Sequence, residues 1–497
     1  MNSPGSAAPS GRPNIVFILI DDLGWADVGC YGSTFYETPR LDRLAAEGAL
    51  FTDAYAASPV CSPTRASLLT GKYPPTVGVT QYIGGHGVGR LLDVPYFGFL
   101  PTHELSLARA LREGGYQTWH VGKWHLGPRR CWPDQHGFDV NLGGCEWGHP
   151  KSYFSPYHCP TLSDGPDGEY LTDRLTDEAI RLIGASGDRP FFLNLWHYAV
   201  HIPIDSPPAL VAKYEQKARQ LGLDAVEPFA VGEPFGVWHQ RRARITRRTL
   251  QSDPAYAAMI ENLDTNVGRL LDALDETGQA GNTLVVFTSD NGGLATAEGS
   301  PTCNAPLAEG KGWLHEGGVR EPLIARWPGV IPAGTRISEP VTSPDFYPTL
   351  ISAAGLAQRP GQHVDGVDFS ALLRGEPFSR GPLYFHYPHY SNQGGRPASA
   401  IRDGDWKLVH DWETGRSALF RLSTDMGETT DLAVGEPALV TRLQNQLRAW
   451  VADGGYAVPA PNAVPDAYPD LAGYFLHGQI ATPPVDPDRA AGIEETG

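Results

Sequence analysis

The chain has 497 residues, of which 41% are hydrophobic and 19% are charged. At about 100 to 200 residues per domain, this length allows two to four domains and excludes a short peptide or a disordered chain. The 56 acidic and 39 basic residues leave a formal net charge of −17, which excludes a general attraction to nucleic acid or to an anionic membrane. An anionic substrate must therefore be held by a local cationic pocket.

The start of the chain carries no recognisable targeting signal. Residues 1–13 are polar and lack the apolar stretch of a secretory signal, so they are predicted to form a loose leader. The apolar run at 15–20 is far shorter than the roughly 20 residues that span a bilayer, so no membrane segment is expected. Six cysteines without a C-x-x-C pair favour a reducing, cytoplasmic compartment.

Three continuous apolar runs, at 14–20, 190–196 and 283–288, predict strands that are buried on both faces. Apolar residues at steps of three and four predict a helix over 256–274, and shorter helices are expected at 38–48 and 106–114. Alternating strands and helices indicate an α/β fold with a large, mostly parallel or mixed sheet flanked by helices. Ligands of such sheets bind beyond the carboxyl ends of the strands.

The sequence changes character after about residue 380. Short segments around turn-like Gly404 and Gly415 within 398–422 predict antiparallel strands, and 437–451 predicts one amphipathic helix. We therefore expect a catalytic domain over 14–380 and a small α+β domain with an antiparallel sheet over 381–456. The proline-rich residues 457–497 are expected to form an extended tail along the surface.

Polar side chains follow two of the predicted strands. Asp21 and Asp22 come directly after the first strand, and Asp290 and Asn291 follow the run at 283–288. If they converge, two carboxylates ~4 Å apart repel by about 4 kcal/mol at an effective dielectric of about 20, so the cluster requires a cation. Oxygen-only donors favour calcium, then magnesium, over zinc. Either motif alone could equally be an ordinary helix-capping turn.

A lone cysteine precedes a predicted helix. Cys61 begins the string Cys-Ser-Pro-Thr-Arg, in which proline occupies an early helical position and Arg65 follows one turn later on the same face. A helix N-terminus favours an anion. A buried, inert thiol is the ordinary alternative for an isolated cysteine, and a thiolate nucleophile would want an adjacent histidine, which the local sequence lacks.

The Cys61 string and five further motifs resemble those of the type I sulfatases of the alkaline phosphatase superfamily, in which the cysteine is oxidised to formylglycine by a formylglycine-generating enzyme. The resemblance covers most of the chain, in the order of the family. It includes Asn14 to Gly24 with Asp21-Asp22, Cys61-Ser-Pro-Thr-Arg65, Val121-Gly-Lys123-Trp-His125, His201-Ile-Pro203, Thr288-Ser-Asp290-Asn291 and Gly310-Lys311 to Arg320. Thr64, where the family more often has serine, is among a few small departures.

The resemblance implies a role for each matching residue. A calcium ion would be held by Asp21, Asp22, Asp290 and Asn291, with the modified Cys61 beside it. Arg65 would steady the formylglycine, Lys123 and Lys311 would bind sulfate oxygens, His125 would hydrogen-bond the formylglycine diol, and His201 would face the leaving-group oxygen. Individually, each has an ordinary alternative: a surface lysine, a structural histidine, a strand end or a loop cation.

The proposed chemistry is consistent in charge. Three carboxylates and a divalent cation sum to −1 and would repel a sulfate ester, but Arg65, Lys123 and Lys311 add +3. Donors at the bridging oxygen stabilise the charge that develops as the S–O bond breaks, a role for His201 as general acid, alone or together with Lys311. The hydrated aldehyde offers two hydroxyl groups, one to attack sulfur and one to release sulfate.

Two further features are less specific. Arg241, Arg242, Arg244, Arg247 and Arg248 form a basic run, predicted to be a solvated helix face, although such a cluster could touch an anionic polysaccharide. The aromatic and glycine-rich segment 81–100 fits either a substrate-facing loop or packing.

The sequence thus predicts a sulfatase acting on sulfate monoesters, with no nucleic-acid or membrane partner. A sulfated carbohydrate and an aryl sulfate both fit, and polar loops that carry tryptophan favour the carbohydrate. The alternatives are a phosphonate or phosphate ester hydrolase of the same superfamily and an inactive binding relative. Retention of Cys61, Arg65, Lys123 and the aspartates argues against the inactive relative.

Overall fold

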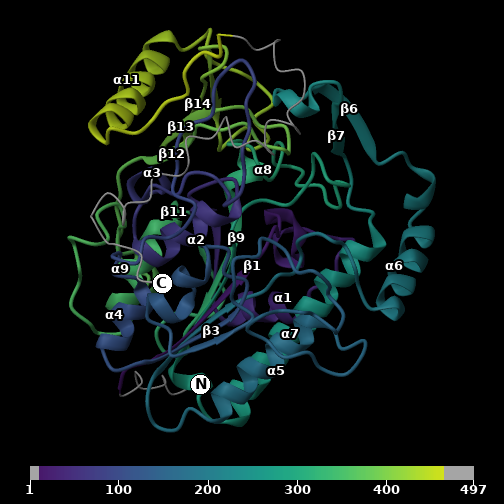
Figure 1. The fold of residues 1–497 in the computed structure, drawn as a ribbon, viewed down its shortest axis with the longest axis vertical. Helices are drawn as coiled ribbons and strands as arrows, with labels where there is room; N and C mark the ends of the chain where they lie inside the picture. The colour runs from purple at the N-terminus through teal and green to yellow at the C-terminus, as the bar shows by residue number, and fades with distance from the viewer. Residues whose placement is uncertain (1–10, 464–497) are drawn as a thin grey trace, which may run out of the picture.

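The computed structural model describes residues 11–463. Its centre is a nine-stranded sheet with the order β10-β2-β9-β8-β1-β5-β3-β4, and β11 also pairs with β2 (Figure 1). The strands are β1 Asn14–Ile20, β2 Ala49–Tyr55, β3 Gln117–Gly122, β4 Val140–Leu142, β5 Phe191–Trp196, β8 Thr283–Ser289, β9 Arg320–Arg326, β10 Thr335–Ile337 and β11 Val341–Thr342.

The sheet is mixed but mostly parallel, as predicted. β1 runs parallel to both of its neighbours, β5 and β8, and β9 is antiparallel to β8 and to β2. The three apolar runs of the sequence form β1, β5 and β8, which lie side by side at the middle of the sheet. Their continuous apolarity follows from this place, because a central strand is covered on both faces.

Helices cover both faces of the sheet. Val16, Ile18 and Ile20 of β1 belong to one apolar core, whereas the alternate residues Phe17 and Leu19 belong to the other. The first core is closed by α1 Pro39–Glu47, α5 Leu171–Gly184 and α7 Pro254–Glu276, with α6 Pro208–Gln220 packed on α7. The second is closed by α2 Cys61–Thr70, α4 Leu107–Glu113 and α9 Phe346–Ala353. The three helices predicted at 38–48, 106–114 and 256–274 are confirmed as α1, α4 and α7.

A separate four-stranded antiparallel sheet lies in the C-terminal region, as predicted (Figure 1). It consists of β12 Leu383–Tyr387, β13 Ala398–Asp403, β14 Trp406–Asp411 and β15 Ser417–Arg421. The helix α11 Pro437–Asp453 packs on β13, β14 and β15 through Leu443 and Leu447. Short helices α3 Pro74–Val77, α8 Glu316–Val319 and α10 Ser370–Leu373 join the elements.

The basic run does not form a helix face, so that prediction is wrong. Arg241 directly follows a short 3-10 helix, Trp238–Gln240, and Arg244–Arg248 is strand β7, which pairs with β6 Phe229–Pro234. The hairpin is anchored by Phe235, Val237 and Ile245, which pack together in a small apolar cluster. Alternation along a strand sends neighbouring arginines in different directions.

The predicted terminal segments lie partly outside the described residues. This applies to residues 1–10 of the leader and to 464–497 of the tail. Before that point, Pro461 forms a β-bridge with Leu91, and Asn462 donates from its side chain to Gly89 O. The domain boundaries at 380 and 456 stay predictions. Among residues 11–463, no helix has the length and apolar character needed to cross a bilayer.

Candidate active site

The acidic residues meet where β1 and β8 end. These strands are paired in register up to Ile20 and Ser289, so the next residues of both strands emerge at the same level. Asp290 N donates to Ile20 O at 3.1 Å, and Asp22 N donates to Asp290 Oδ1 at 3.3 Å. Asn291 Nδ2 donates to Asp22 Oδ1 at 2.8 Å. The side chains of Asp21, Asp22, Asp290 and Asn291, which together we call the acidic edge, are all buried. The structure therefore brings together residues about 270 positions apart in the sequence.

Helix α2 places Cys61 and Arg65 beside this edge. Cys61 is the first residue of the helix and is 3% exposed. Arg65 is fully buried: its Nε and Nη2 lie 2.8 and 2.7 Å from Asp290 Oδ2, and its Nη1 donates to Lys123 O at 3.0 Å. Its guanidinium also lies over the ring of Trp196. Arg65 therefore links the Asp290 carboxylate to the backbone of the Lys123 segment through charge-assisted hydrogen bonds from Nε and Nη1.

His125 is the histidine that the local sequence around Cys61 lacked. Its Nδ1 lies 3.2 Å from Cys61 Sγ, and its Nε2 lies 3.1 Å from Ile83 O. A carbonyl oxygen only accepts, so Nε2 carries the proton and Nδ1 is free to accept one from Cys61. Burial, followed by the charge of Lys123, lowers the pKa of His125 well below its usual value, which keeps the ring neutral. The residue has a positive φ of 55°, which is uncommon outside glycine.

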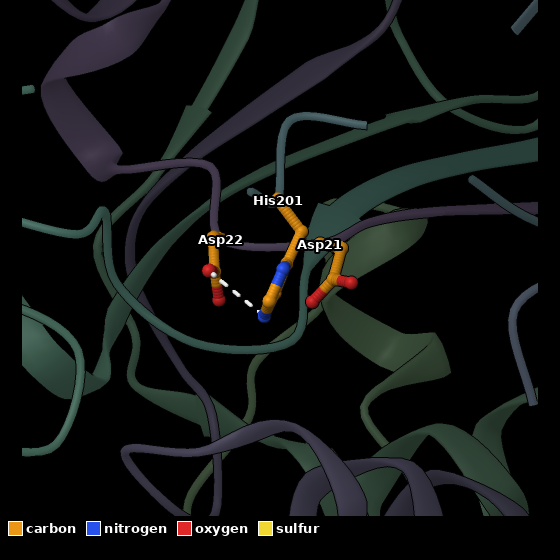
Figure 2. Close-up of side chains that lie close together, drawn as sticks. All are labelled: Asp21, Asp22 and His201. Carbon is orange, nitrogen blue, oxygen red and sulfur yellow. Dashed lines mark ion pairs between the residues drawn. The ribbon is translucent and has the colours of Figure 1, made fainter. Parts of the chain in front are cut away.

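Two lysines and His201 complete the cluster. Lys123 Nζ lies 2.5 Å from Asp21 Oδ2, and Lys311 Nζ lies 2.8 Å from Asp22 Oδ2. Lys311 Nζ is also 2.9 Å from His201 Nε2. Figure 2 shows His201 between the two aspartates, with Nε2 3.6 Å from Asp22 Oδ2. His201 Nδ1 lies 2.9 Å from Ile202 O, so Nδ1 carries the proton and Nε2 accepts from Lys311.

The two neighbouring aspartates differ in their affinity for a proton. Burial raises the pKa of Asp21 to about 8, although Lys123 opposes the shift. For Asp22, burial acts in the same direction, but the charge of Lys311 outweighs it and holds the pKa well below its usual range. Lys123 therefore offsets the burial of Asp21 less completely than Lys311 offsets the burial of Asp22.

The donor set fits a hard divalent cation. Asp21 Oδ1 and Asn291 Oδ1 are buried and have no hydrogen-bond partner, a costly state for a polar atom. Ligand atoms of Asp21, Asp22 and His201 lie within 4.8 Å of one another. Because His201 Nε2 already accepts a hydrogen bond from Lys311, the atoms available as metal ligands are oxygens, and oxygen ligands suit Ca²⁺.

Sequence reasoning missed several residues that hold this site in place. Ser62 Oγ donates to His125 O and accepts from Ile83 N, and the Ile83 carbonyl itself orients His125. His149 lies parallel to the His201 ring, with centroids 6.1 Å apart. Ser62 was visible beside Cys61, but a backbone carbonyl or a distant ring leaves no sequence signal. In the 81–100 segment, Tyr96 and Phe99 are buried, which favours packing at those positions.

Comparisons with known proteins agree with the fold. The sulfatase family model matches residues 13–356, and the model for the C-terminal part of N-sulphoglucosamine sulphohydrolase matches residues 310–453. A sulfatase of Formosa agariphila is 32% identical over 88% of this chain and 89% of its own length. Arylsulfatase A of Bos taurus is 35% identical over 86% of this chain and 84% of its own length.

A solved structure, that of Ps i-CgsB in complex with k-i-k-neocarrahexaose, superposes with a TM-score of 0.71 at 30% identity. It covers 89% of this chain and 93% of that one. The fold and these matches define a hydrolase of the alkaline phosphatase superfamily. Within it, the chain belongs to the sulfatase family and is a sulfuric ester hydrolase.

Proposed function

We propose that the protein hydrolyses the sulfate monoester of a sulfated carbohydrate through a formylglycine made from Cys61, with a calcium ion held by Asp21, Asp22, Asp290 and Asn291. The observation that carries the proposal is the position of Cys61. It begins α2, lies 3.2 Å from an unprotonated His125 nitrogen, and adjoins the acidic edge. Magnesium is the second choice of ion.

The formal charges support an anionic substrate. Asp21, Asp22 and Asp290 carry −3, and Arg65, Lys123 and Lys311 carry +3, so the residues alone are neutral. A divalent cation leaves the site at +2, which attracts a sulfate ester of charge −1. The protein as a whole has a net charge of −17, so this local excess is what draws the substrate in.

Each side chain has a separate task in the proposed reaction. His125 Nδ1 accepts a proton from the group at position 61. Lys123 and Lys311 exchange part of their contact with the aspartates for contact with sulfate oxygens. The leaving oxygen takes its proton from the Lys311–His201 pair, in which Lys311 holds the proton and His201 Nε2 accepts its hydrogen bond. This refines the sequence-based role of His201 as general acid, since the proton resides on Lys311.

Formylglycine and calcium would supply the remaining chemistry. Formylglycine, when hydrated, provides a hydroxyl nucleophile and a second hydroxyl for sulfate release, and Cys61 would be its source through a formylglycine-generating enzyme. Calcium, when bound, polarises oxygen ligands at the acidic edge and neutralises the carboxylates. The lysines, Arg65 and the histidines do the binding and proton transfer.

A carbohydrate is the preferred alcohol. The solved structure at 30% identity is a complex with an oligosaccharide, k-i-k-neocarrahexaose. The site also lies among half-buried polar loops that carry Tyr82 and Trp313. A phosphonate or phosphate ester would demand the same cationic site, so it is the competing substrate class in the test.

The test combines mass and turnover. The intact mass of a tryptic peptide covering Cys61 should show conversion of the thiol to the aldehyde. 4-Nitrophenyl sulfate should then be hydrolysed much faster than 4-nitrophenyl phosphate or a phenylphosphonate ester. An unmodified thiol in protein that still hydrolyses the sulfate would overturn the proposed nucleophile, and preference for phosphonate would overturn the substrate class.

The calcium site has a readout that does not depend on turnover. Added Ca²⁺ should raise the melting temperature, because an ion that binds only the folded state stabilises it. Asn291→Ala, which removes an unpartnered oxygen, should reduce this shift. An exposed carboxylate variant such as Glu436→Gln is the control. An equal shift in both variants would place the ion elsewhere.

The compartment and the domain division complete the proposal. All six cysteines are unpaired thiols, a state typical of a reducing compartment such as the cytoplasm. Alkylation without prior reduction, read by mass spectrometry, should label the five cysteines other than the converted Cys61. Limited proteolysis should cut near residues 380 and 456 if the catalytic domain spans 14–380 and the α+β domain spans 381–456.

A further inference from the structure

A second cationic hollow lies at the loop that joins β6 to β7. It has a volume of about 520 Å³, within the roughly 300 to 1,000 Å³ typical of ligand pockets. Four arginines line it, Arg90, Arg241, Arg242 and Arg396, together with a single carboxylate, Glu413. In formal charge the wall is therefore +3, in a protein whose total is −17.

The structure divides the basic run into arginines with carboxylate partners and arginines that face the hollow. Arg247 lies 2.8 to 2.9 Å from Glu309 and Glu233, and Arg248 pairs with Asp253. Arg244 Nε donates to Gly232 O. By contrast, Arg241 and Arg242 are exposed and line the hollow. The positive charge thus remains concentrated on one side of the hairpin.

The guanidinium of Arg241 is fixed in place by Trp238. Its guanidinium carbon lies 3.5 Å from the centroid of the Trp238 ring, and Nη1 donates to Trp238 O at 3.0 Å. A guanidinium has five N–H donors, and this contact uses one. Stacking on an aromatic face fixes the planar group, which lowers the entropy lost when it binds an oxyanion bidentately.

The remaining wall is also fixed. Arg396 Nη1 and Arg90 Nε lie 3.3 and 3.9 Å from Glu413 Oε1, and Tyr390 OH donates to Glu413 Oε2. One carboxylate is thus shared by two arginines and a tyrosine. Arg90 is 78% exposed at its side chain, so this pairing is weak in water.

One wall of the hollow is connected to the Lys311 segment of the active site by a tight backbone contact. Gly395, which precedes Arg396, packs on Gly312, which follows Lys311; a Cβ at Gly395 would lie 1.8 Å from Gly312 O. Standard backbone dimensions then place the Cα atoms of Lys311 and Arg396 at most about 13 Å apart. The segment that begins at Ile83, against His125, reaches the hollow at Gly89 and Arg90.

We propose that this hollow, defined by Arg90, Arg241, Arg242 and Arg396, binds a second sulfate group of the substrate while the scissile sulfate lies at position 61. The proposal rests on the proposed function and extends it. The substrate would be an oligosaccharide or polysaccharide that carries sulfate on more than one sugar, rather than a singly sulfated sugar or an aryl sulfate. The hollow holds the substrate and takes no part in bond cleavage.

The test uses sulfated dextran oligosaccharides as the probe and glucose 6-sulfate as the singly sulfated reference. Binding to the full-length protein is measured by calorimetry for the wild type, for Arg241→Gln/Arg242→Gln and for a control pair, Arg181→Gln/Arg219→Gln. The control pair removes the same charge from exposed positions on α5 and α6. The single variant Arg242→Gln keeps the Arg241–Trp238 stack, so it tests the hollow if the double variant is misfolded.

We expect Arg241→Gln/Arg242→Gln to weaken oligosaccharide binding at least tenfold, with a smaller loss for Arg242→Gln. The control pair should change it less than twofold, and glucose 6-sulfate should not distinguish the variants. The loss should grow at low salt, since screening weakens charge attraction. Equal affinities in the two double variants, or equal losses for both ligands, would overturn the proposal.

Parallel turnover of 4-nitrophenyl sulfate separates this inference from the proposed function. If the wild type binds the oligosaccharide through these arginines but hydrolyses no sulfate ester, the proposed function fails and the anion site stands. If it hydrolyses the aryl sulfate and the arginine variants bind the oligosaccharide as the wild type does, the hollow fails and the proposed function stands.

Discussion

Two buried clusters of this protein contain the same set of charges and have different uses. The active-site cluster contains Asp21, Asp22, Asp290, Arg65, Lys123 and Lys311. The second, which we call the joining cluster, connects the main sheet to the C-terminal sheet and contains Asp53, Glu316, Glu428, Arg320, Arg402 and Lys407. Each has three acids and three bases, so each is neutral in formal charge.

The clusters differ in how completely their atoms are paired. In the joining cluster, Lys407 Nζ lies 2.8 Å from Glu316 Oε1 and 3.0 Å from Glu428 Oε1, and Tyr55 OH donates to Glu316 Oε2. Glu428 Oε1 makes no hydrogen bond, but the Lys407 ammonium lies directly against it. In the active-site cluster, Asp21 Oδ1 also has no hydrogen-bond partner, and its ion-pair contact with Arg65 Nη2 is longer, at 3.8 Å; beside it, Asn291 Oδ1 has no hydrogen-bond partner. A paired cluster fixes geometry, whereas unpartnered oxygens beside a nucleophile leave room for an ion and a substrate.

The largest expected effect is at the nucleophile. Cys61→Ala should lower kcat for 4-nitrophenyl sulfate by at least about 10⁴-fold, as for other removed nucleophiles. Its folding should persist, because the thiol makes no ion pair in the bare protein. Cys303→Ala, at another buried thiol, is the control. Retained turnover in Cys61→Ala would show that the active-site cluster does not use this position.

The next effect tests the joining cluster. Lys407→Met should lower the free energy of unfolding by about 3 to 5 kcal/mol, because it leaves Glu316 and Glu428 buried without their shared cation. Denaturant unfolding measures the loss. Lys213→Met removes an exposed lysine from a surface ion pair and should cost about 1 kcal/mol or less. Similar losses in both variants would contradict a structural role for the cluster.

The matching substitution in the active-site cluster should act on turnover. Lys311→Ala should lower kcat about a hundredfold if the ammonium stabilises the leaving oxygen or the sulfate. A rise in KM alone would show ground-state binding instead. Lys72→Ala, at a lysine paired with Glu104 outside the site, should leave kcat within about twofold. The two lysines thus separate catalysis from packing.

The smallest expected effect is the pH dependence of stability that Glu428 gives to the joining cluster. Burial raises the pKa of Glu428 to about 7, although Lys407 opposes the shift. A carboxyl whose folded pKa lies above its unfolded value of about 4.5 favours folding at low pH, and this contribution is lost as the pH rises through about 7. Glu428→Gln should therefore gain stability relative to the wild type between about pH 5 and pH 8, on the order of 1 to 3 kcal/mol.

Melting curves at pH 5 and pH 8 measure this difference. Glu436→Gln, at an exposed carboxylate, should follow the wild type at both values. If Glu428→Gln also follows the wild type, the carboxyl of Glu428 is ionised throughout this range, and its charge does not destabilise the folded protein.

The sequence predicted the main elements because their signals are local. Uninterrupted apolar runs identified β1, β5 and β8, and a stripe of Leu263, Val267, Leu270 and Leu274 identified α7. The polar residues that follow β1 and β8 were expected to converge because parallel strands end at one edge of a sheet. Motif resemblance then implied roles for Cys61, His125 and the lysines.

Other features had no local signal. The antiparallel placement of β9 depends on how the sheet is completed. The basic run, predicted to be a helix face, lies in the β6–β7 hairpin, where Arg247 and Arg248 pair with carboxylates and Arg241 and Arg242 line the hollow. The contact of His125 with the Ile83 carbonyl involves a backbone atom, which every residue possesses. The joining cluster draws on residues from Asp53 to Glu428, whose separate surroundings gave no indication of one another.

The amino-acid sequence by itself determined which segments are buried and which side chains could perform the chemistry, because burial periodicity and side-chain type belong to short stretches of chain. The tertiary structure decided which charges find partners. Pairing depends on distances of a few ångströms between segments hundreds of residues apart. It leaves Asp21 and Asn291 each with an oxygen that has no hydrogen-bond partner, whereas Lys407 and Glu316 form an ion pair with each other.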